Sequence, residues 1–177
     1  MTSDPPDIEH EGPDADHESV ARRILLDALT GQARSRQELR DKLAKKEVPA
    51  ELAERLLERF TEVGLVDDEA FARSWVEGRQ RSRGLARRAL AQELRRKGVD
   101  DETARTALDE LDPDQEEHAA RLLVRKKLPT LRGVDRATAT RRLAGVLARK
   151  GYPAGMAFSI VRDELGDVEH DSDMMGG

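Results

Sequence analysis

The sequence predicts an all-α protein, organised as an elongated array of three tandem three-helix repeats with disordered acidic termini. Three observations lead to this prediction. Charged residues make up 38% of the 177 residues and aromatic residues only 3%, a balance typical of helices and unfavourable for a β-sandwich or β-barrel. Helix-capping residues recur along the chain, and a pattern of apolar positions repeats at a fixed interval.

The two ends of the chain are acidic and the part between them is basic. Of the 36 acidic residues, seven lie in residues 1–19 and four in residues 166–177, and neither segment contains Lys or Arg. The rest of the chain therefore contains the remaining 25 acidic residues and all 31 basic residues. Because segments this rich in Asp, Pro and Gly cannot bury enough apolar surface to fold, we expect disordered tails at 1–18 and 166–177.

Capping signals define nine expected helices. Ser35 followed by Glu38 forms a capping-box pattern before the second helix. Asp100 precedes an acidic first turn, and Asp112 with Pro113 supplies an N-cap and a proline at the first helical position. Three glycines are placed where a helix is expected to end with a residue in the left-handed backbone conformation: Gly64, Gly98 and Gly151. The expected helices are 19–29, 35–46, 50–62, 67–82, 85–97, 101–111, 113–128, 136–150 and 154–165.

The apolar pattern repeats without a gap when the chain is shifted by 51 residues. Leu39 then falls on Leu90 and Leu43 on Leu94. The other matched pairs are Ala21 with Ala72, Ile24 with Trp75, Leu25 with Val76, Val48 with Val99, Ala53 with Ala104, Leu57 with Leu108 and Phe60 with Leu111. Because the turn positions repeat at the same interval as the apolar positions, the chain is predicted to contain copies of one structural unit.

A third copy is offset in two pieces, first by 47 and then by 53 residues. A longer connection that contains Pro129 and Gly133 accounts for the difference. The expected repeats are residues 19–66, 67–111 and 112–165. Since each repeat buries a small apolar stripe and docks on its neighbour, we expect a long surface and no deep pocket.

The residues that usually carry catalysis or metal binding are scarce. Cys is absent, which excludes disulfides and thiol chemistry. His118, the one His outside the acidic ends, is interpreted as a solvated surface residue. The carboxylates of residues 67–69 are interpreted as capping the helix that follows rather than as a metal site. We therefore expect no enzyme activity, no cofactor and no metal.

No apolar run is long enough to span a membrane, and the acidic N-terminus lacks the pattern of a signal peptide. We therefore expect a soluble, cytoplasmic protein.

Two basic segments flank an acidic one. Residues 79–97 hold eight basic residues and one acidic residue, and residues 121–150 hold ten and one. Residues 99–117 between them hold nine acidic residues and a single Arg. Because Arg suits contacts with phosphate or carboxylate groups, the alternation predicts a basic stripe that binds an anionic partner. The candidate contact residues are Arg79, Arg81, Arg83, Arg87, Arg88, Arg95, Arg96, Lys97, Arg121, Arg125, Lys126, Lys127, Arg141 and Arg142.

Part of this pattern has a purely structural interpretation. Lys45–Lys46, Arg96–Lys97 and Arg149–Lys150 each end the middle helix of a repeat, where cations stabilise the helix dipole. Phe71 and Trp75 share one helical face and are interpreted as core residues. Readout of nucleic-acid bases through aromatic stacking is therefore not indicated.

Two stretches of sequence resemble the RecX family. Residues 64–73, GLVDDEAFAR, are similar to its signature. That signature begins with Gly, followed by Leu or Ile, then by Ile or Val, and then by two Asp residues. Further on, it has Phe or Tyr directly before Ala. Arg83–Gly84, followed by Leu90, Leu94 and residues 97–99, is similar to a second stretch of that family, whose ending recurs at 149–152. The resemblance covers residues 19–165, and the acidic tails are additional to it.

The resemblance implies a non-catalytic regulator of the bacterial RecA recombinase, acting in DNA recombination, DNA repair and the SOS response. Members of that family lie in the groove of the RecA–single-stranded DNA filament and inhibit its ATPase, strand-exchange and co-protease activities. The implied partners are the RecA filament and single-stranded DNA, with duplex DNA as a further partner, and we expect a monomer.

Two other functions remain open on the sequence. A three-helix unit can place one helix in the major groove, so the chain could be a helical DNA-binding protein acting directly on duplex or single-stranded DNA. The charged stripes could also serve a scaffold that pairs only with proteins.

Overall fold

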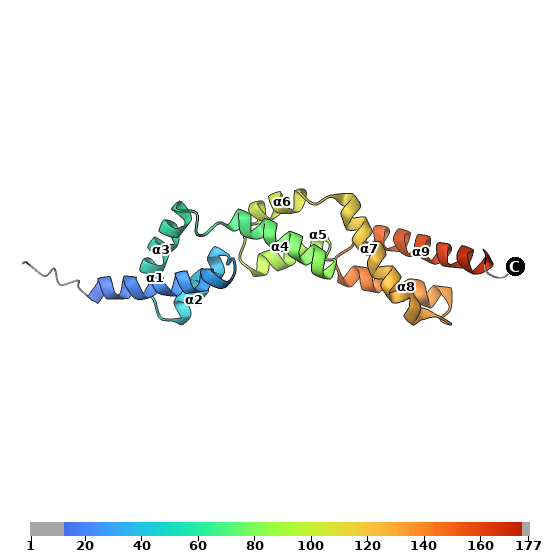
Figure 1. Ribbon diagram of the computed structural model, residues 1–177, viewed down its shortest axis with the longest axis horizontal. Helices are drawn as coiled ribbons and strands as arrows, with labels where there is room; N and C mark the ends of the chain where they lie inside the picture. Colours follow the sequence, from blue (N-terminus) through green and yellow to red (C-terminus); the bar gives the residue numbers. More distant parts are fainter. Residues whose placement is uncertain (1–12, 175–177) are drawn as a thin grey trace, which may run out of the picture. The chain divides into compact units, whose positions relative to one another are not determined.

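The computed structural model describes residues 13–174, and the expected all-α class is confirmed (Figure 1). Within that range there are nine α-helices, one 3-10 helix and no β-strand. The elements are α1 (Pro13–Gly31), α2 (Arg36–Lys45), α3 (Ala50–Glu62), α4 (Asp68–Arg83), α5 (Arg87–Arg96), α6 (Asp101–Asp109), α7 (Pro113–Lys127), η1 (Leu128–Leu131), α8 (Arg136–Arg149) and α9 (Ala154–Met174).

The first and last helices extend into segments that were expected to be disordered. The other seven begin and end within two residues of their expected bounds, but α1 begins at Pro13 and α9 continues to Met174. Residues 13–18 and 166–174, which were assigned to the tails, are thus included in α1 and α9. Pro13 and an acidic first turn favour a helix start, and each helix is extended from a packed segment at little cost. Residues 1–12 and 175–177 lie outside the described residues.

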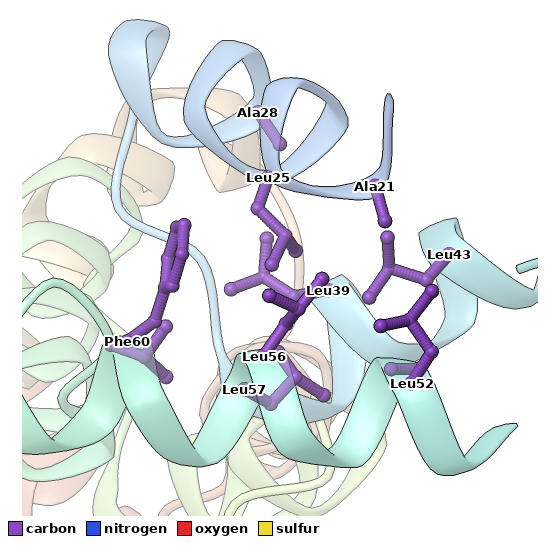
Figure 2. Close-up of a cluster of buried hydrophobic side chains, with 11 residues drawn as sticks. Ala21, Leu25, Ala28, Leu39, Leu43, Leu52, Leu56, Leu57 and Phe60 are labelled. Carbon is purple, nitrogen blue, oxygen red and sulfur yellow. The ribbon is translucent and has the colours of Figure 1, made fainter. Parts of the chain in front are cut away.

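The chain divides into two compact units, residues 1–68 and 69–177. In the first unit, α1, α2 and α3 pack around one core of aliphatic side chains, closed at one end by Phe60 (Figure 2). Leu25, Leu39 and Leu43 are fully buried there. The heptad-like spacing on each helix puts these side chains on the face that meets the other two helices.

The second unit contains two such cores. The first is formed by α4, α5 and α6, with Leu90 and Leu94 at its centre. The second is formed by α7, α8 and α9, with Leu147 and Val161 fully buried. Leu43, Leu94 and Leu147, which the repeat register superposes, are each 0% exposed. Each set of three successive helices is called a bundle below.

Several contacts join the two bundles of the second unit, and three of them involve the backbone. Ala86, just before α5, is fully buried in the α7–α9 core, and its N–H donates to the carbonyl of Lys150 at 2.8 Å. The Tyr152 hydroxyl donates to the carbonyl of Gly84, also at 2.8 Å. Gly151, with φ +93°, lies so close to Ala89 that a Cβ at residue 151 would be 2.6 Å from the Ala89 nitrogen. The two bundles are thus joined through backbone as well as side chains.

Carboxylates satisfy the free N–H groups at several helix starts. The expected capping box is present at α2, where Ser35 accepts from Glu38 N–H and the Glu38 carboxylate accepts from Ser35 N–H. Asp100 and Asp112 cap α6 and α7 as expected. The Asp68 carboxylate has a role that the sequence did not indicate, since it accepts from Arg36 N–H at 2.8 Å.

We predict that Gly151→Ala destabilises the second unit far more than Gly133→Ala. Both glycines have left-handed backbones, with φ +93° and +80°, so each substitution costs about 1 kcal/mol in backbone strain. Only residue 151 adds a clash with Ala89, worth about 1–3 kcal/mol, because nothing lies within 4 Å of a Cβ at residue 133. Urea unfolding followed by fluorescence of Trp75, the single Trp of the chain, measures both. Equal losses would show that the close approach at Ala89 is unimportant.

Candidate functional site

The fourteen candidate basic residues all belong to the second unit, where they lie on or next to α4, α5, α7 and α8. Their side chains fall into two groups. Those of the first group form ion pairs or, for Lys97, a cation–π contact within the protein, and those of the second are exposed. The distinction decides which of them are available to a partner, because a paired cation must exchange one anion for another.

Trp75 organises the basic residues near the end of α4. The Arg79 guanidinium lies 4.4 Å from the centroid of its ring and the Lys97 ammonium 4.7 Å. The indole N–H donates to Glu93 at 2.9 Å, and the same carboxylate is 3.3 Å from Arg79 and 4.0 Å from Arg83. Trp75 also stacks on Phe71, with the two centroids 5.8 Å apart, so the prediction that both pack against the core is confirmed.

Two further candidates pair with the acidic α6. Arg87 lies 3.3 Å from Asp109 and Arg95 lies 3.4 Å from Asp101. These side chains are largely exposed, so each pair contributes roughly 0–1 kcal/mol and both cations are easily released to a competing anion.

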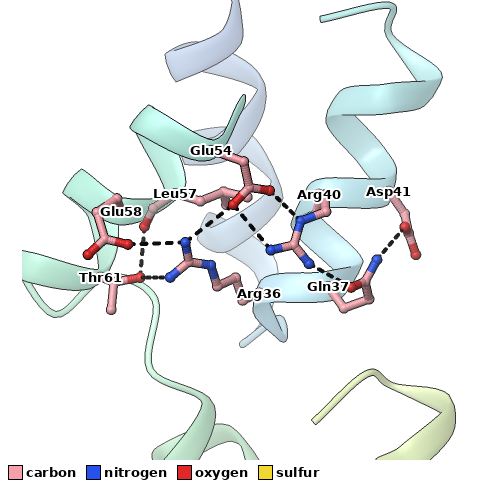
Figure 3. A network of polar contacts seen from close by, with 8 residues as sticks. All are labelled: Arg36, Gln37, Arg40, Asp41, Glu54, Leu57, Glu58 and Thr61. Atoms are coloured by element: carbon pink, nitrogen blue, oxygen red, sulfur yellow. Dashed lines mark hydrogen bonds and ion pairs between the residues drawn. The ribbon is translucent and has the colours of Figure 1, made fainter. Parts of the chain in front are cut away.

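The Arg87–Asp109 pair has a counterpart in the first unit. A shift of 51 residues places Arg36 on Arg87 and Glu58 on Asp109, and Arg36 lies 3.2 Å from Glu58 (Figure 3). Glu54 accepts hydrogen bonds from Arg40 and Arg36, and that from Arg40 contributes most to holding the pKa of its carboxyl below the usual value. The repeat thus preserves an ion pair between the second and third helices of the first two bundles.

Arg121 and Arg125 hold α7 against α9. Both donate to Glu164, which is only 4% exposed, at 3.3 Å and 2.8 Å, and Arg121 also pairs with Glu117 and Asp163. Burial raises the pKa of the Glu164 carboxyl, but the hydrogen bonds from the two guanidinium groups outweigh it and the net pKa is lowered. These two candidates therefore serve packing of the last bundle.

The second group of candidates is exposed and forms no ion pair with any residue whose side chain the structure describes. Its members are Arg81, Arg88, Arg96, Lys126, Lys127, Arg141 and Arg142. Lys127, Arg141 and Arg142 line one open hollow between the end of α7, η1 and α8, called here the α7–α8 hollow. Arg88, Arg96 and Lys126 are on the exposed faces of α5 and α7.

One basic residue of the α7–α8 hollow was missed by the sequence analysis. Arg149 was interpreted only as a dipole-stabilising residue at the end of α8, yet it lines the hollow with the other three cations. Its guanidinium folds back toward Gly145, so that a Cβ there would be 3.4 Å from its Nη1. The spacing of Arg141, Gly145 and Arg149, each four residues apart, was the available signal.

The described residues contain no group of three or more His, Asp or Glu side chains that could hold a metal ion. His118 is exposed on α7, as expected. Asp68 and Asp67 both have interactions within the protein. No helix in the described part of the chain is both long enough and apolar enough to cross a membrane.

Comparison with known families matches two parts of the chain. Residues 21–60 match the family description "RecX, first three-helix domain", and residues 67–108 match "RecX, second three-helix domain". Proteins named "Regulatory protein RecX" are similar over most of the chain. The protein of Streptomyces lividans is 52% identical over 93% of this chain and 87% of its own, and that of Thermobifida fusca is 53% identical over 82% and 78%.

Solved structures show the same fold. The crystal structure of RecX from Lactobacillus salivarius has a TM-score of 0.79 at 21% identity and covers 85% of this chain and 97% of its own. A crystal structure of regulatory protein RecX has a TM-score of 0.76 at 25% identity, over 84% and 73% of the two chains.

We predict that Glu164→Gln lowers the free energy of unfolding of the second unit by about 1–3 kcal/mol at pH 7, because it leaves Arg121 and Arg125 without their buried anion. Glu117→Gln is the matched control, since it removes an exposed i,i+4 partner of Arg121 and should cost about 0.5 kcal/mol or less.

The difference between wild type and Glu164→Gln should depend on pH. A carboxyl whose pKa is lowered by folding adds stability that is complete above its unfolded pKa, about 4.3, and is lost as the pH falls through its folded value. Urea unfolding of both proteins from pH 7 to pH 3 should show the difference shrinking below about pH 4. A difference that stays constant over this range would contradict an ionised Glu164.

Proposed function

This chain belongs to the RecX family of regulatory proteins, and from that premise we propose that it regulates the bacterial RecA recombinase without catalysing a reaction itself. The observation that carries the proposal is the 52% identity to a regulatory protein RecX over 93% of the chain.

The regulation that we propose is inhibition. The protein binds along the RecA–single-stranded DNA filament as a monomer and lowers its ATPase, strand-exchange and co-protease activities. Arrays of small bundles suit a filament, because each bundle adds a modest contact and the contacts reinforce one another when they are linked. Such binding is stronger than that of any single bundle.

The exposed and unpaired cations are the best-placed contacts for this partner. Arg81 on α4 and Arg88 on α5 have no ion pair to give up among the residues whose side chains are described, unlike Arg87 and Arg95. An anionic surface of the filament, protein or DNA, can approach them without breaking an internal contact. Among the candidates on α4 and α5, the absence of such a pair therefore favours Arg81 and Arg88 over Arg87 and Arg95.

We expect the protein to inhibit ATP hydrolysis by a bacterial RecA recombinase on single-stranded DNA at well below one molecule per recombinase protomer. Capping or destabilising a polymer needs few copies, so inhibition should be substoichiometric. The measurement is the steady-state ATPase rate of the cognate recombinase, titrated with this protein. If the rate is unchanged at stoichiometric excess while the protein binds duplex DNA with sequence preference, a helical DNA-binding protein is the correct function.

We also expect the double substitution Arg81→Glu and Arg88→Glu to raise the concentration needed for half-inhibition by about tenfold, because charge reversal replaces attraction by repulsion. Arg105→Glu with Arg162→Glu is the matched control, since both residues are exposed in the same unit and the net charge changes equally. Far-UV circular dichroism checks that both variants are folded. An equal loss of inhibition in the two variants would mean that net charge, and not these positions, governs binding.

A further inference from the structure

A groove lies between α4 and α7, the first helices of the two bundles in the second unit. It is called here the α4–α7 groove, and it shares no lining residue with the α7–α8 hollow. Its volume of about 400 Å³ falls in the range of ligand-binding sites. Glu77, Gln80 and Arg81 line it from α4, and Gln115, Ala119 and Leu122 line it from α7.

The joint between the two bundles closes one end of the groove. A Cβ at Gly84, directly after α4, would be 3.0 Å from Cδ1 of Leu123, so the end of α4 lies against α7. The Gly84 carbonyl is also held by the Tyr152 hydroxyl. From Gln115 to Leu122 the groove follows about 10 Å of α7, which is room for about three residues of an extended chain.

The groove contains apolar surface that the core does not use. Leu122 is 50% exposed, whereas Val124, two residues further along α7, is fully buried in the α7–α9 core. Ala119 lies three residues before Leu122 and therefore on the same face of α7. Covering these two side chains would remove apolar surface from water, which favours binding of a partner's apolar side chain.

The polar side chains of the groove suit the backbone of a peptide. The side-chain nitrogen of Gln80 is shielded from solvent and has no hydrogen-bond acceptor in the part of the chain that the structure describes. A shielded donor without an acceptor is costly, so a carbonyl that approaches it gains a hydrogen bond. Gln115 and His118 are exposed on the α7 side. Side-chain amides both donate and accept, as the N–H and carbonyl groups of an extended peptide require.

The charges of the groove favour a protein over a nucleic acid. Arg81 and Glu77 are both exposed, and neither forms an ion pair with a residue whose side chain is described. A phosphodiester strand would be attracted by Arg81 but repelled by Glu77, one turn earlier on α4. A single acidic side chain of a peptide can pair with Arg81 without placing further negative charge near Glu77.

We propose that the α4–α7 groove binds a short extended segment of a protein partner. An apolar side chain of the segment packs on Leu122, an acidic side chain pairs with Arg81, and the peptide backbone bonds to the side-chain amides of Gln80 and Gln115. The proposal deepens the proposed function and rests on it, because it assigns the segment to the recombinase. It gives this part of the second unit a contact with protein and not with DNA.

The first test is inhibition of the recombinase ATPase by full-length variants. Leu122→Glu should raise the concentration needed for half-inhibition at least about tenfold, because it puts a charge where the partner's apolar side chain packs. Leu26→Glu is the matched control, since Leu26 is 45% exposed on α1, outside the groove. It should inhibit nearly as wild type. Circular dichroism checks that both variants are folded.

Gln80→Leu separates binding from stability. The substitution removes a shielded donor that has no acceptor among the described residues, so the free energy of unfolding in urea should not fall. Inhibition should nevertheless weaken by about threefold to tenfold, because the partner's carbonyl loses its donor. A variant that is less stable but inhibits as wild type would give Gln80 a structural role only.

The second test identifies what the groove contacts. Leu122 is replaced by the photo-reactive residue benzoylphenylalanine, and the protein is irradiated with the recombinase on oligothymidine. We expect cross-links to one recombinase peptide that contains an acidic residue, and none when Leu26 is replaced instead. Cross-links from residue 122 mainly to oligothymidine, or to a second copy of this chain, would overturn the proposal.

Failure of the groove and failure of the proposed function give different results. If the wild-type chain inhibits the ATPase and the folded Leu122→Glu variant inhibits equally well, the regulator function stands and the groove is not the contact. An equal loss in Leu122→Glu and Leu26→Glu leads to the same conclusion. If the wild-type chain neither inhibits the recombinase nor cross-links to it, the proposed function itself is wrong.

Discussion

The free N–H groups at the start of the middle helix of each bundle are the constraint on which the architecture depends. A short helix cannot satisfy its first N–H groups internally. At α2, a capping box and the Asp68 carboxylate supply the acceptors. At α5, the N-cap is Ala86, which has no side-chain oxygen, and its N–H bonds instead to Lys150 in the next bundle, while Glu116 accepts weakly from Arg87 N–H. The second bundle is therefore completed by the third.

The sequence was informative wherever a contact is local. Caps and glycines lie within four residues of the groups they serve, so seven helices could be placed closely, and the register of 51 residues identified the core positions. Contacts between distant helices carry no such signal. Nothing near Arg121 in the sequence shows that Glu164, 43 residues away, is its buried partner. The basic stripe was predicted as one surface, and only the fold separates its paired cations from its exposed ones.

That separation changes how the net charge should be understood. The formal charge of −5 describes a chain with acidic ends, but the charge that a partner meets is local. Arg79 and Arg83 share Glu93, and Arg121 and Arg125 share Glu164, so these four arginines mostly stabilise packing. The last bundle contains both paired and unpaired arginines. The paired arginines are on α7 and contact α9, whereas the unpaired arginines are on α8 and line the hollow.

The bond from Ala86 to Lys150 also imposes an order on synthesis at the ribosome. The first unit, which ends at residue 68, is synthesised before the second. The second bundle has its own helices by residue 109, but the acceptor for Ala86 and the Tyr152 hydroxyl are translated only later. At about 5–20 residues per second, that leaves α5 with an unpaired start for several seconds after Ala86 is made. The nascent chain thus passes through a stage at which the start of α5 lacks the acceptor that it has in the folded protein.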